Sequence, residues 1–203
     1  AANIPELAKQ GHKVSANLRG SKADLWDGGH RIPFIVKWPR RVKAGSQSDQ
    51  LICLTDLFST VGEIIGVRVP SGSCEDSVSF LPALSGEKIK STRKGVVHHS
   101  FSGHFAYRMG KWKLLLAKAS GGWTSPKENQ VKAGAPNAQL YNMDMDIGEQ
   151  KNLYENEKKI VADMMSNLES DVRSGRSTDG PKSKNDISEI VLWKSGEKSK
   201  SKR

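Results

Sequence analysis

Residues 17–39 constrain the fold more than any other part of the chain. Residues 17–31 are rich in glycine and polar side chains, which is typical of a loop, and the pair Gly28–Gly29 permits a close backbone approach that a Cβ would forbid. A short apolar run, Phe34–Trp38, follows between two prolines. Such a run suits a strand that is buried on at least one face, and prolines mark its ends. The sequence therefore predicts an ordered loop that leads into one short strand.

Positive charge is concentrated around this loop. The chain carries 32 Lys/Arg against 22 Asp/Glu, a net charge of +10, and residues 8–43 alone hold nine Lys/Arg against two Asp. Because these basic residues are mixed with glycines, aromatics and prolines, they indicate an ordered region that faces anions. Nucleic acid and a sulfated or phosphorylated small substrate are both candidates. We expect no nucleic-acid partner, since the alternation of basic and aromatic residues typical of such proteins is missing.

The last ten residues, 194–203, hold five Lys/Arg against one Glu and are low in complexity. Such a segment cannot bury apolar surface, so we expect a disordered basic tail. Apolar runs elsewhere are far shorter than the ~20 residues that span a bilayer. We therefore expect neither a transmembrane helix nor a membrane partner.

The N-terminus bears on whether the sequence is complete, and the cysteines bear on the redox state of the compartment. The chain opens with residues 1–5, AANIP, without an initiator methionine or a signal peptide. We therefore expect the sequence to begin part-way through a longer protein. The two cysteines, Cys53 and Cys74, exclude a multi-cysteine zinc site. They leave open one disulfide or two free thiols.

Hydrophobic periodicity predicts mixed α and β structure followed by a small antiparallel sheet. The expected helices are 49–65 and 155–174, and the expected strands after the first are 95–100, 104–108, 111–116, 139–142 and 187–193. The first helix has an apolar stripe with a 3.6-residue period, formed by Leu57, Phe58, Val61, Ile64 and Ile65. Residues 67–93 are rich in Pro, Gly and Ser, so we place a boundary there and expect domains 1–88 and 89–193.

Common catalytic motifs are absent from the sequence. It has no phosphate-binding glycine loop, no nucleophile elbow and no histidine pair at metal spacing. Successive side chains of a strand point to opposite faces, so the adjacent His98 and His99 cannot easily share one metal ion. We expect no metal site in this chain, and these histidines either line a pocket or serve as hydrogen-bonded structural residues.

Residues 18–39, LRGSKADLWDGGHRIPFIVKWP, resemble the second-half signature of the formylglycine-dependent sulfatases of the arylsulfatase type. Three later segments resemble the same family in the same order: Ser48–Phe58 its next helix, Phe105–Leu114 its C-terminal hairpin, and Leu140–Leu153 its turn into the last helix. The resemblance spans residues 1–193. It implies an α/β, alkaline-phosphatase-like sulfatase fold.

In that fold, residues 1–88 would be the C-terminal remnant of the catalytic domain. Residues 89–193 would form a small antiparallel subdomain with the C-terminal helix 155–174. The resemblance also assigns the principal site residue, because Lys22 matches the sulfate-binding lysine of the family. A compact ammonium on a flexible stem suits a sulfate oxygen.

Five residues besides Lys22 are further candidates for substrate binding. Arg19 is expected to pair with Asp24 or Asp27 and to order the loop, with substrate contact as the alternative. His30 stands where relatives often carry an aliphatic residue, which suggests a subfamily-specific substrate contact. Trp26 is either a platform for a sugar or aryl group or a core residue. His98 and His99 complete the set as pocket residues.

The family nucleophile is a Cys or Ser within C/S-x-P-x-R, and neither cysteine of this chain lies in such a motif. The resemblance implies a divalent cation, calcium, and places the family's metal ligands N-terminal to the residues matched here. It therefore implies the C-terminal part of a sulfuric ester hydrolase that is inactive alone, located outside the cytoplasm and acting on a sulfated small molecule or saccharide. The alternative is a non-catalytic anion-binding module for sulfated polysaccharide.

Overall fold

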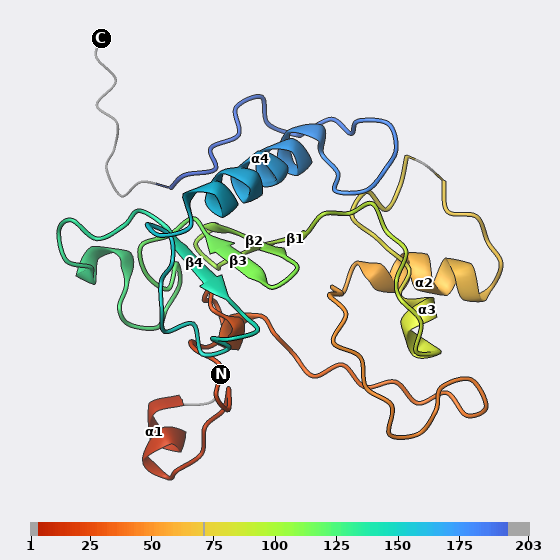
Figure 1. Ribbon diagram of the computed structural model, residues 1–203, viewed down its shortest axis with the longest axis horizontal. Coiled ribbons are helices and arrows are strands. Elements are labelled where there is room, and N and C mark those ends of the chain that lie inside the picture. The colour runs from red at the N-terminus through yellow and green to blue at the C-terminus, as the bar shows by residue number, and fades with distance from the viewer. Residues whose placement is uncertain (1–3, 71, 195–203) are drawn as a thin grey trace. The chain divides into compact units, whose positions relative to one another are not determined.

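The computed structural model describes residues 4–70 and 72–194 (Figure 1). The predicted disordered tail therefore lies, apart from Lys194, outside the described residues. Elements follow in the order α1 (Ile4–Lys9), η1 (Asp27–Gly29), α2 (Asp56–Ile64), α3 (Leu81–Leu84), β1 (Val96–His99), β2 (Phe105–Met109), β3 (Trp112–Leu115), η2 (Glu128–Gln130), β4 (Gln139–Asn142) and α4 (Lys158–Ser174). None of the helices in the described ranges is long and apolar enough to cross a membrane.

The chain forms two compact units, each built from separate stretches of sequence. The first, here called the sheet unit, combines the residues up to Ile32 with Val97–Met164 and the residues from Val191 onward. The second, the α2 unit, combines Pro33–Val96 with Met165–Ile190. The division of the sequence at residue 88 remains a prediction about the whole protein.

The sheet unit is built on a four-stranded sheet with the order β1-β2-β3-β4. β2 and β3 form the predicted hairpin, and the pair Met109↔Trp112 closes it around Gly110, whose φ is +53°. β4 adds an antiparallel partner to β3, as the sequence predicted. The buried core comprises Leu25, Trp26, Ala106, Leu115, Ala117, Tyr141 and Met143. The loop at 24–26 is thus part of the same core as the sheet.

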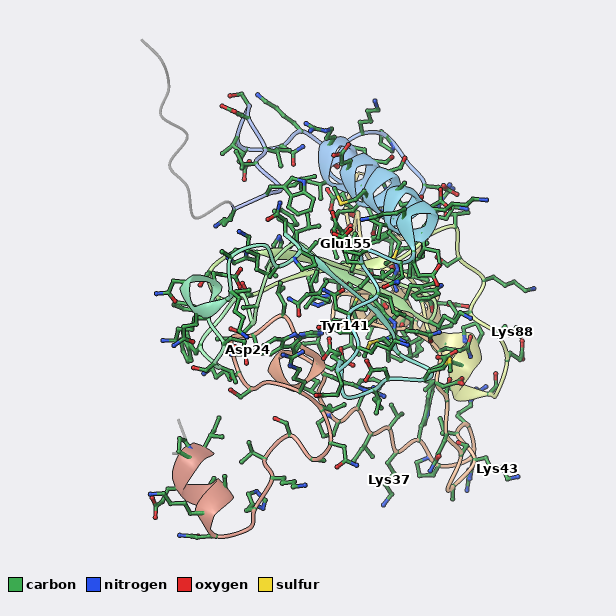
Figure 2. All side chains as sticks on the ribbon, turned by 60° about the vertical axis from the view of Figure 1, so that its left-hand side comes forward. Asp24, Lys37, Lys43, Lys88, Tyr141 and Glu155 are labelled. Atoms are coloured by element: carbon green, nitrogen blue, oxygen red, sulfur yellow. The ribbon has the colours of Figure 1, made fainter. Side chains whose placement is uncertain are left out.

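The predicted last helix is confirmed, although it begins at Lys158 rather than at residue 155. Its inward stripe, Val161, Met164 and Leu168, is buried at the spacing of an amphipathic helix. In both views the first turns of α4 and the short turn η1 lie on opposite sides of the sheet (Figure 1, Figure 2). The helix ends before Gly175, whose φ is +67° and whose Cβ would meet the carbonyl oxygen of Ser183 at 2.6 Å.

The α2 unit corrects the predicted start of the first helix. The helix begins at Asp56, because the buried Asp56 carboxylate accepts a hydrogen bond from the backbone N–H of Cys53 at 2.9 Å and thereby closes a turn there. The same carboxylate forms a salt bridge with Arg93 at 2.6 Å. The apolar stripe is present, but all five of its side chains are exposed within the described residues.

Two predicted strands do not form within the described part of the chain. Residues 34–38 and 187–193 have no strand assignment, and Ile35 is 89% exposed. A strand requires a neighbouring chain to complete its ladder of hydrogen bonds, and apolar character alone does not supply one. The predictions of strands at 34–38 and 187–193 were therefore wrong for this structure.

Candidate functional site

Lys22 lies at the tip of a tight turn, Ser21–Asp24. The backbone N–H of Asp24 donates to the carbonyl of Ser21 at 3.1 Å, while the N–H of Ser21 donates to the Asp24 carboxylate at 2.8 Å. Ala23 takes a φ of +88°, which turns the chain sharply after Lys22. The Lys22 side chain is exposed and, within the described residues, makes no hydrogen bond or ion pair. Its ammonium is therefore available to an anion.

Hydrogen bonds to the Asp24 carboxylate connect this turn to the loop that follows β3. Its second carboxylate oxygen accepts hydrogen bonds from the N–H groups of Trp123 at 2.8 Å and Thr124 at 3.1 Å. The hydroxyls of Ser21 and Thr124 are also 2.9 Å apart. Asp24 is buried, and Figure 2 labels it. The backbone around Lys22 is therefore held by buried, charge-assisted hydrogen bonds.

The pair Gly28–Gly29 makes the close approach that the sequence predicted. A Cβ on Gly28 would meet the carbonyl oxygens of Gly20 at 2.3 Å and Arg19 at 2.6 Å. A Cβ on Gly29 would meet the carbonyl oxygen of Asp24 at 2.2 Å. All three contacts are with backbone, which cannot yield as a flexible side chain does. These glycines allow the loop to fold back on itself beneath Lys22.

A buried ion cluster connects the glycine loop to the sheet. The Lys113 ammonium, from β3, lies 2.6 Å from Asp27 Oδ1 and 2.7 Å from Glu149 Oε1, and all three side chains are buried. The other Glu149 oxygen accepts the backbone N–H of Asp27 at 2.6 Å. Lys113 thus joins the central hairpin, the turn η1 and the segment after β4 in one cluster.

The two carboxylates of the cluster differ in their protonation behaviour. Burial works to raise the pKa of Asp27, but hydrogen bonds and charge from His30 and Lys113 hold it well below its usual range. Burial raises the pKa of Glu149, and the attraction of Lys113 only partly offsets that effect. Asp27 is therefore the carboxylate that stays ionised opposite Lys113, and Glu149 takes up a proton more readily.

Arg19 and Trp26 make packing contacts and hydrogen bonds in the sheet unit. The Arg19 guanidinium lies 3.7 Å over the Trp26 ring and donates to the carbonyl of Glu149 at 2.6 Å and to the Tyr141 hydroxyl at 3.2 Å. These partners replace the Asp24 or Asp27 pairing that we expected, because both carboxylates are used elsewhere. Trp26 is buried and donates through its indole N–H to Gln139 at 3.1 Å. Burial raises the pKa of Tyr141 to about 12, which keeps its hydroxyl protonated.

The predicted histidines separate into two environments. The rings of His30 and His98 are in contact, with centroids 3.8 Å apart and planes tilted by 37°, and His30 Nε2 lies 3.5 Å from Asp27 Oδ1. His99 instead packs edge-on against Phe105 at 4.3 Å, as the alternation of a strand requires. Within the described residues, His30 Nδ1 and His98 Nε2 are buried without a hydrogen-bond partner. Burial lowers the pKa of both His30 and His98, and in each case the nearby Lys113 charge acts in the same direction.

The described residues around the Ser21–Asp24 turn offer one exposed cation, Lys22, and no residue in the family's nucleophile motif. No group of three or more His, Cys, Asp or Glu residues in ranges 4–70 and 72–194 could hold a metal ion. The two carboxylates of the ion cluster are occupied by Lys113. Sequence reasoning missed Lys113 and Glu149. A lysine within the apolar strand WKLL was the available signal, since a buried lysine needs a carboxylate partner.

We expect Lys113→Met to lower the free energy of unfolding by about 3–5 kcal/mol at pH 7, because it leaves two carboxylates buried without their cation. The loss should be smaller at pH 5, where Glu149 can take up a proton. Urea unfolding of the 203-residue chain measures both values. Lys111→Met is the matched control, since Lys111 is exposed, and it should change stability by less than about 0.5 kcal/mol. A Lys113 variant as stable as this control would contradict a stabilising role for the cluster.

We expect the contacting histidines His30 and His98 to cause a loss of stability in mild acid. Their pKa values are lowered in the folded chain, so below about pH 6.5 the unfolded chain binds more protons and folding weakens. The slope approaches about 1.4 kcal/mol per pH unit for each histidine that stays neutral. Urea unfolding between pH 7.5 and 5.5 should show it, and the double variant His30→Gln/His98→Gln should have a flatter profile. Identical profiles for the two proteins would count against this origin.

Comparisons with known proteins show that the chain is similar to sulfatases. The family model described as N-sulphoglucosamine sulphohydrolase, C-terminal, matches residues 21–121, which include the Lys22 turn and the central hairpin. An N-acetylgalactosamine-6-O-sulfatase of Bacteroides thetaiotaomicron is 29% identical over 163 residues, which are 79% of this chain and 31% of that protein. Steryl-sulfatase of Homo sapiens is 32% identical over 101 residues, or 48% of this chain and 17% of that protein.

A solved sulfatase structure has a similar fold. It comes from work on the metabolism of multiple glycosaminoglycans by Bacteroides thetaiotaomicron, and it matches with a TM-score of 0.68 and 25% identity over 83% of this chain and 35% of its own. The chain thus spans about a third or less of the length of these relatives. Their fold is alkaline-phosphatase-like, as the sequence predicted. The chain belongs to the family of formylglycine-dependent sulfatases of the arylsulfatase type and corresponds to the C-terminal portion of its members.

Proposed function

We propose that this chain is the C-terminal part of a sulfuric ester hydrolase and that Lys22 is its sulfate-binding cation. The observation that carries the proposal is the exposed Lys22 ammonium, which has no partner among the described residues and stands on a turn whose backbone is fixed by the buried Asp24 carboxylate. The family match to residues 21–121 includes this turn, which supports the assignment. The sequence resemblance gives Lys22 the same role.

The chemistry of sulfate-ester hydrolysis explains why a fixed cation is useful there. The non-bridging oxygens of the ester are negatively charged, and charge grows on the leaving oxygen as the S–O bond breaks. A preorganised ammonium that faces this charge stabilises the transition state more than the ground state. Because Asp24 holds the backbone of the turn before substrate arrives, the base of the Lys22 side chain is already in place. Lys22 binds and orients the sulfate, and no other exposed group of the turn carries positive charge.

The remaining parts of the reaction belong to residues beyond these 203 in our proposal. The family nucleophile, formylglycine, and a divalent cation, calcium in our proposal, would be supplied by the rest of the protein. The described residues do not fit a metal, so no step is assigned to one here. We propose a sulfated saccharide or small molecule as substrate and a location outside the cytoplasm.

The other predicted site residues take supporting roles in this proposal. Arg19 and Trp26 position the loop, since the Trp26 ring is buried under the Arg19 guanidinium and has no free face in the described residues. His30 and His98 support the loop through the ion cluster. His99 is exposed at the end of β1 and remains our candidate for a direct substrate contact.

Removing the Lys22 charge should impair catalysis and leave the fold intact. We expect Lys22→Ala, in the protein that joins these residues to the sequence preceding them in the reading frame, to lower kcat by about 10²–10³. Lys22→Arg should restore little activity, because a planar guanidinium cannot place its charge where a single ammonium stood. Steady-state hydrolysis of an aryl sulfate measures the effect, and thermal unfolding verifies the fold.

Lys37→Ala and Lys43→Ala are the controls for Lys22. Both lysines are exposed residues of the α2 unit and lie outside the glycine loop (Figure 2). Each variant should change kcat by less than about tenfold, as expected for solvated surface charges. If all three lysines behave alike, the loop is only a diffuse basic surface.

The 203-residue chain alone should hydrolyse no sulfate ester, because it has neither the nucleophile motif nor a metal-binding cluster in its described ranges. The measurement is turnover of 4-nitrocatechol sulfate by the pure chain, with and without a chelator. Chelator-resistant turnover would overturn the proposed division of labour. The non-catalytic alternative makes a different prediction, namely salt-sensitive binding of sulfated polysaccharide by a longer protein that still lacks turnover.

A further inference from the structure

Two large aromatic side chains are exposed beside the Lys22 turn. Phe101 is 72% exposed and Trp123 is 50% exposed. Their ring centroids are 5.0 Å apart and the rings are inclined by 57°. They come from different loops, one after β1 and one after β3, so their contact is not a consequence of sequence proximity. Together we call them the aromatic pair.

The backbone of each aromatic residue is tied directly to the Lys22 turn. The N–H of Phe101 donates to the carbonyl of Ala23 at 2.9 Å, and the N–H of Trp123 donates to the Asp24 carboxylate at 2.8 Å. Ala23 and Asp24 are the two residues that follow Lys22. The position of the aromatic pair relative to the base of the Lys22 side chain is therefore fixed by the fold.

The loop that carries Trp123 is rigidly built, so the exposure of the ring does not reflect a loose segment. The Glu128 carboxylate accepts the N–H groups of Lys118 at 2.8 Å and of Ala119 and Gly121 at 3.0 Å each. A Cβ on Gly122 would meet the carbonyl oxygen of Ala23 at 2.3 Å. An anchored backbone that presents an apolar ring to solvent is typical of a binding surface.

We propose that the aromatic pair binds a saccharide ring of the sulfated substrate while Lys22 binds its sulfate, an inference that rests on the proposed function. A pyranose ring presents C–H groups on its faces and hydroxyls around its edge. The C–H groups pack against the electron-rich faces of aromatic side chains, and the edge needs hydrogen-bonding groups. Two rings inclined to one another suit a puckered sugar better than a flat fused ring system.

The surroundings of the aromatic pair supply the polar groups that such a ligand needs. The hydroxyls of Ser21 and Thr124 pair with each other between Lys22 and Trp123, and both can turn to a ligand hydroxyl. The exposed Lys194 donates to the carbonyl of Ser102, next to Phe101, at 2.8 Å. Basic residues thus stand on segments bonded to or adjacent to both members of the aromatic pair, which favours an anionic saccharide over a neutral one.

The experiment compares a sugar sulfate with an aryl sulfate that has no sugar ring. The protein is the Lys22-containing chain joined to its preceding sequence, and the substrates are N-acetylgalactosamine 6-sulfate and 4-nitrocatechol sulfate. We expect Phe101→Ala and Trp123→Ala each to raise KM for the sugar sulfate about tenfold, the size of one aromatic contact, and KM for the aryl sulfate less than about threefold. Lys22→Ala should lower kcat on both substrates.

Ring-retaining variants separate binding from folding. Phe101→Tyr and Trp123→Phe should keep KM for the sugar sulfate within about threefold of the unmodified protein, because a ring face remains. Phe58→Ala is the control for loss of an exposed aromatic side chain elsewhere, since Phe58 lies on α2 in the other unit. It should leave the ratio of the two KM values unchanged. Thermal unfolding of each variant verifies the fold.

The possible results distinguish this inference from the proposed function. Equal KM changes on both substrates, or no change on either, would overturn the proposed binding of a sugar ring by the aromatic pair. Turnover that depends on Lys22 would in that case still support the proposed function. A protein without any turnover that binds chondroitin sulfate, and loses that binding in Phe101→Ala and Trp123→Ala, would overturn the function and support the binding of a sugar ring by the aromatic pair. Failure of the unmodified protein to bind or turn over either sugar ligand would refute that binding.

Discussion

The buried ammonium of Lys113, held between Asp27 and Glu149, is the interaction on which the rest of the sheet unit depends. It connects three segments that are distant in sequence: the hairpin, the glycine loop and the segment after β4. Burying a lysine is costly, and two carboxylates at 2.6 and 2.7 Å make it tolerable. Because this cluster satisfies Asp27 internally, the glycine loop can fold tightly without directing that carboxylate at Lys22.

Lys22 owes its availability to this arrangement of charges. The acidic residues nearest to it in sequence, Asp24 and Asp27, are both occupied, one by backbone N–H groups and the other by Lys113. A carboxylate that could form an ion pair with Lys22 would neutralise the charge of its ammonium and compete with a bound sulfate. The structure instead uses one buried lysine, Lys113, to hold the loop, and it leaves the exposed Lys22 without a partner in the part of the chain that it describes. Shape and charge of the site are thus provided by separate residues.

The sequence predicted those features that local chemistry determines. The hairpin around Gly110, the stripe of α4 and the close approach at Gly28–Gly29 all follow from turn chemistry, periodicity and the missing Cβ. Features that depend on distant partners were not predictable. Residues 34–38 have strand composition but no neighbouring strand in the described chain, and Arg19 has two nearby aspartates yet binds Tyr141 and Glu149. The stripe of α2 was recognised, but periodicity identifies a face and not what covers it.

A division between fixed backbone and variable side chains would allow one scaffold to serve different substrates. The fixed elements around Lys22 are backbone hydrogen bonds to Asp24 and Glu128, and they do not depend on which side chains stand at positions 101 and 123. Side chains at those positions can change without disturbing the turn that presents the cation. Relatives of this chain are named for sulfates as unlike as those of N-acetylgalactosamine and of sterols. In our proposal the anion is recognised by a lysine on a fixed turn, and the group that carries the anion is recognised by two exposed side chains that are free to vary.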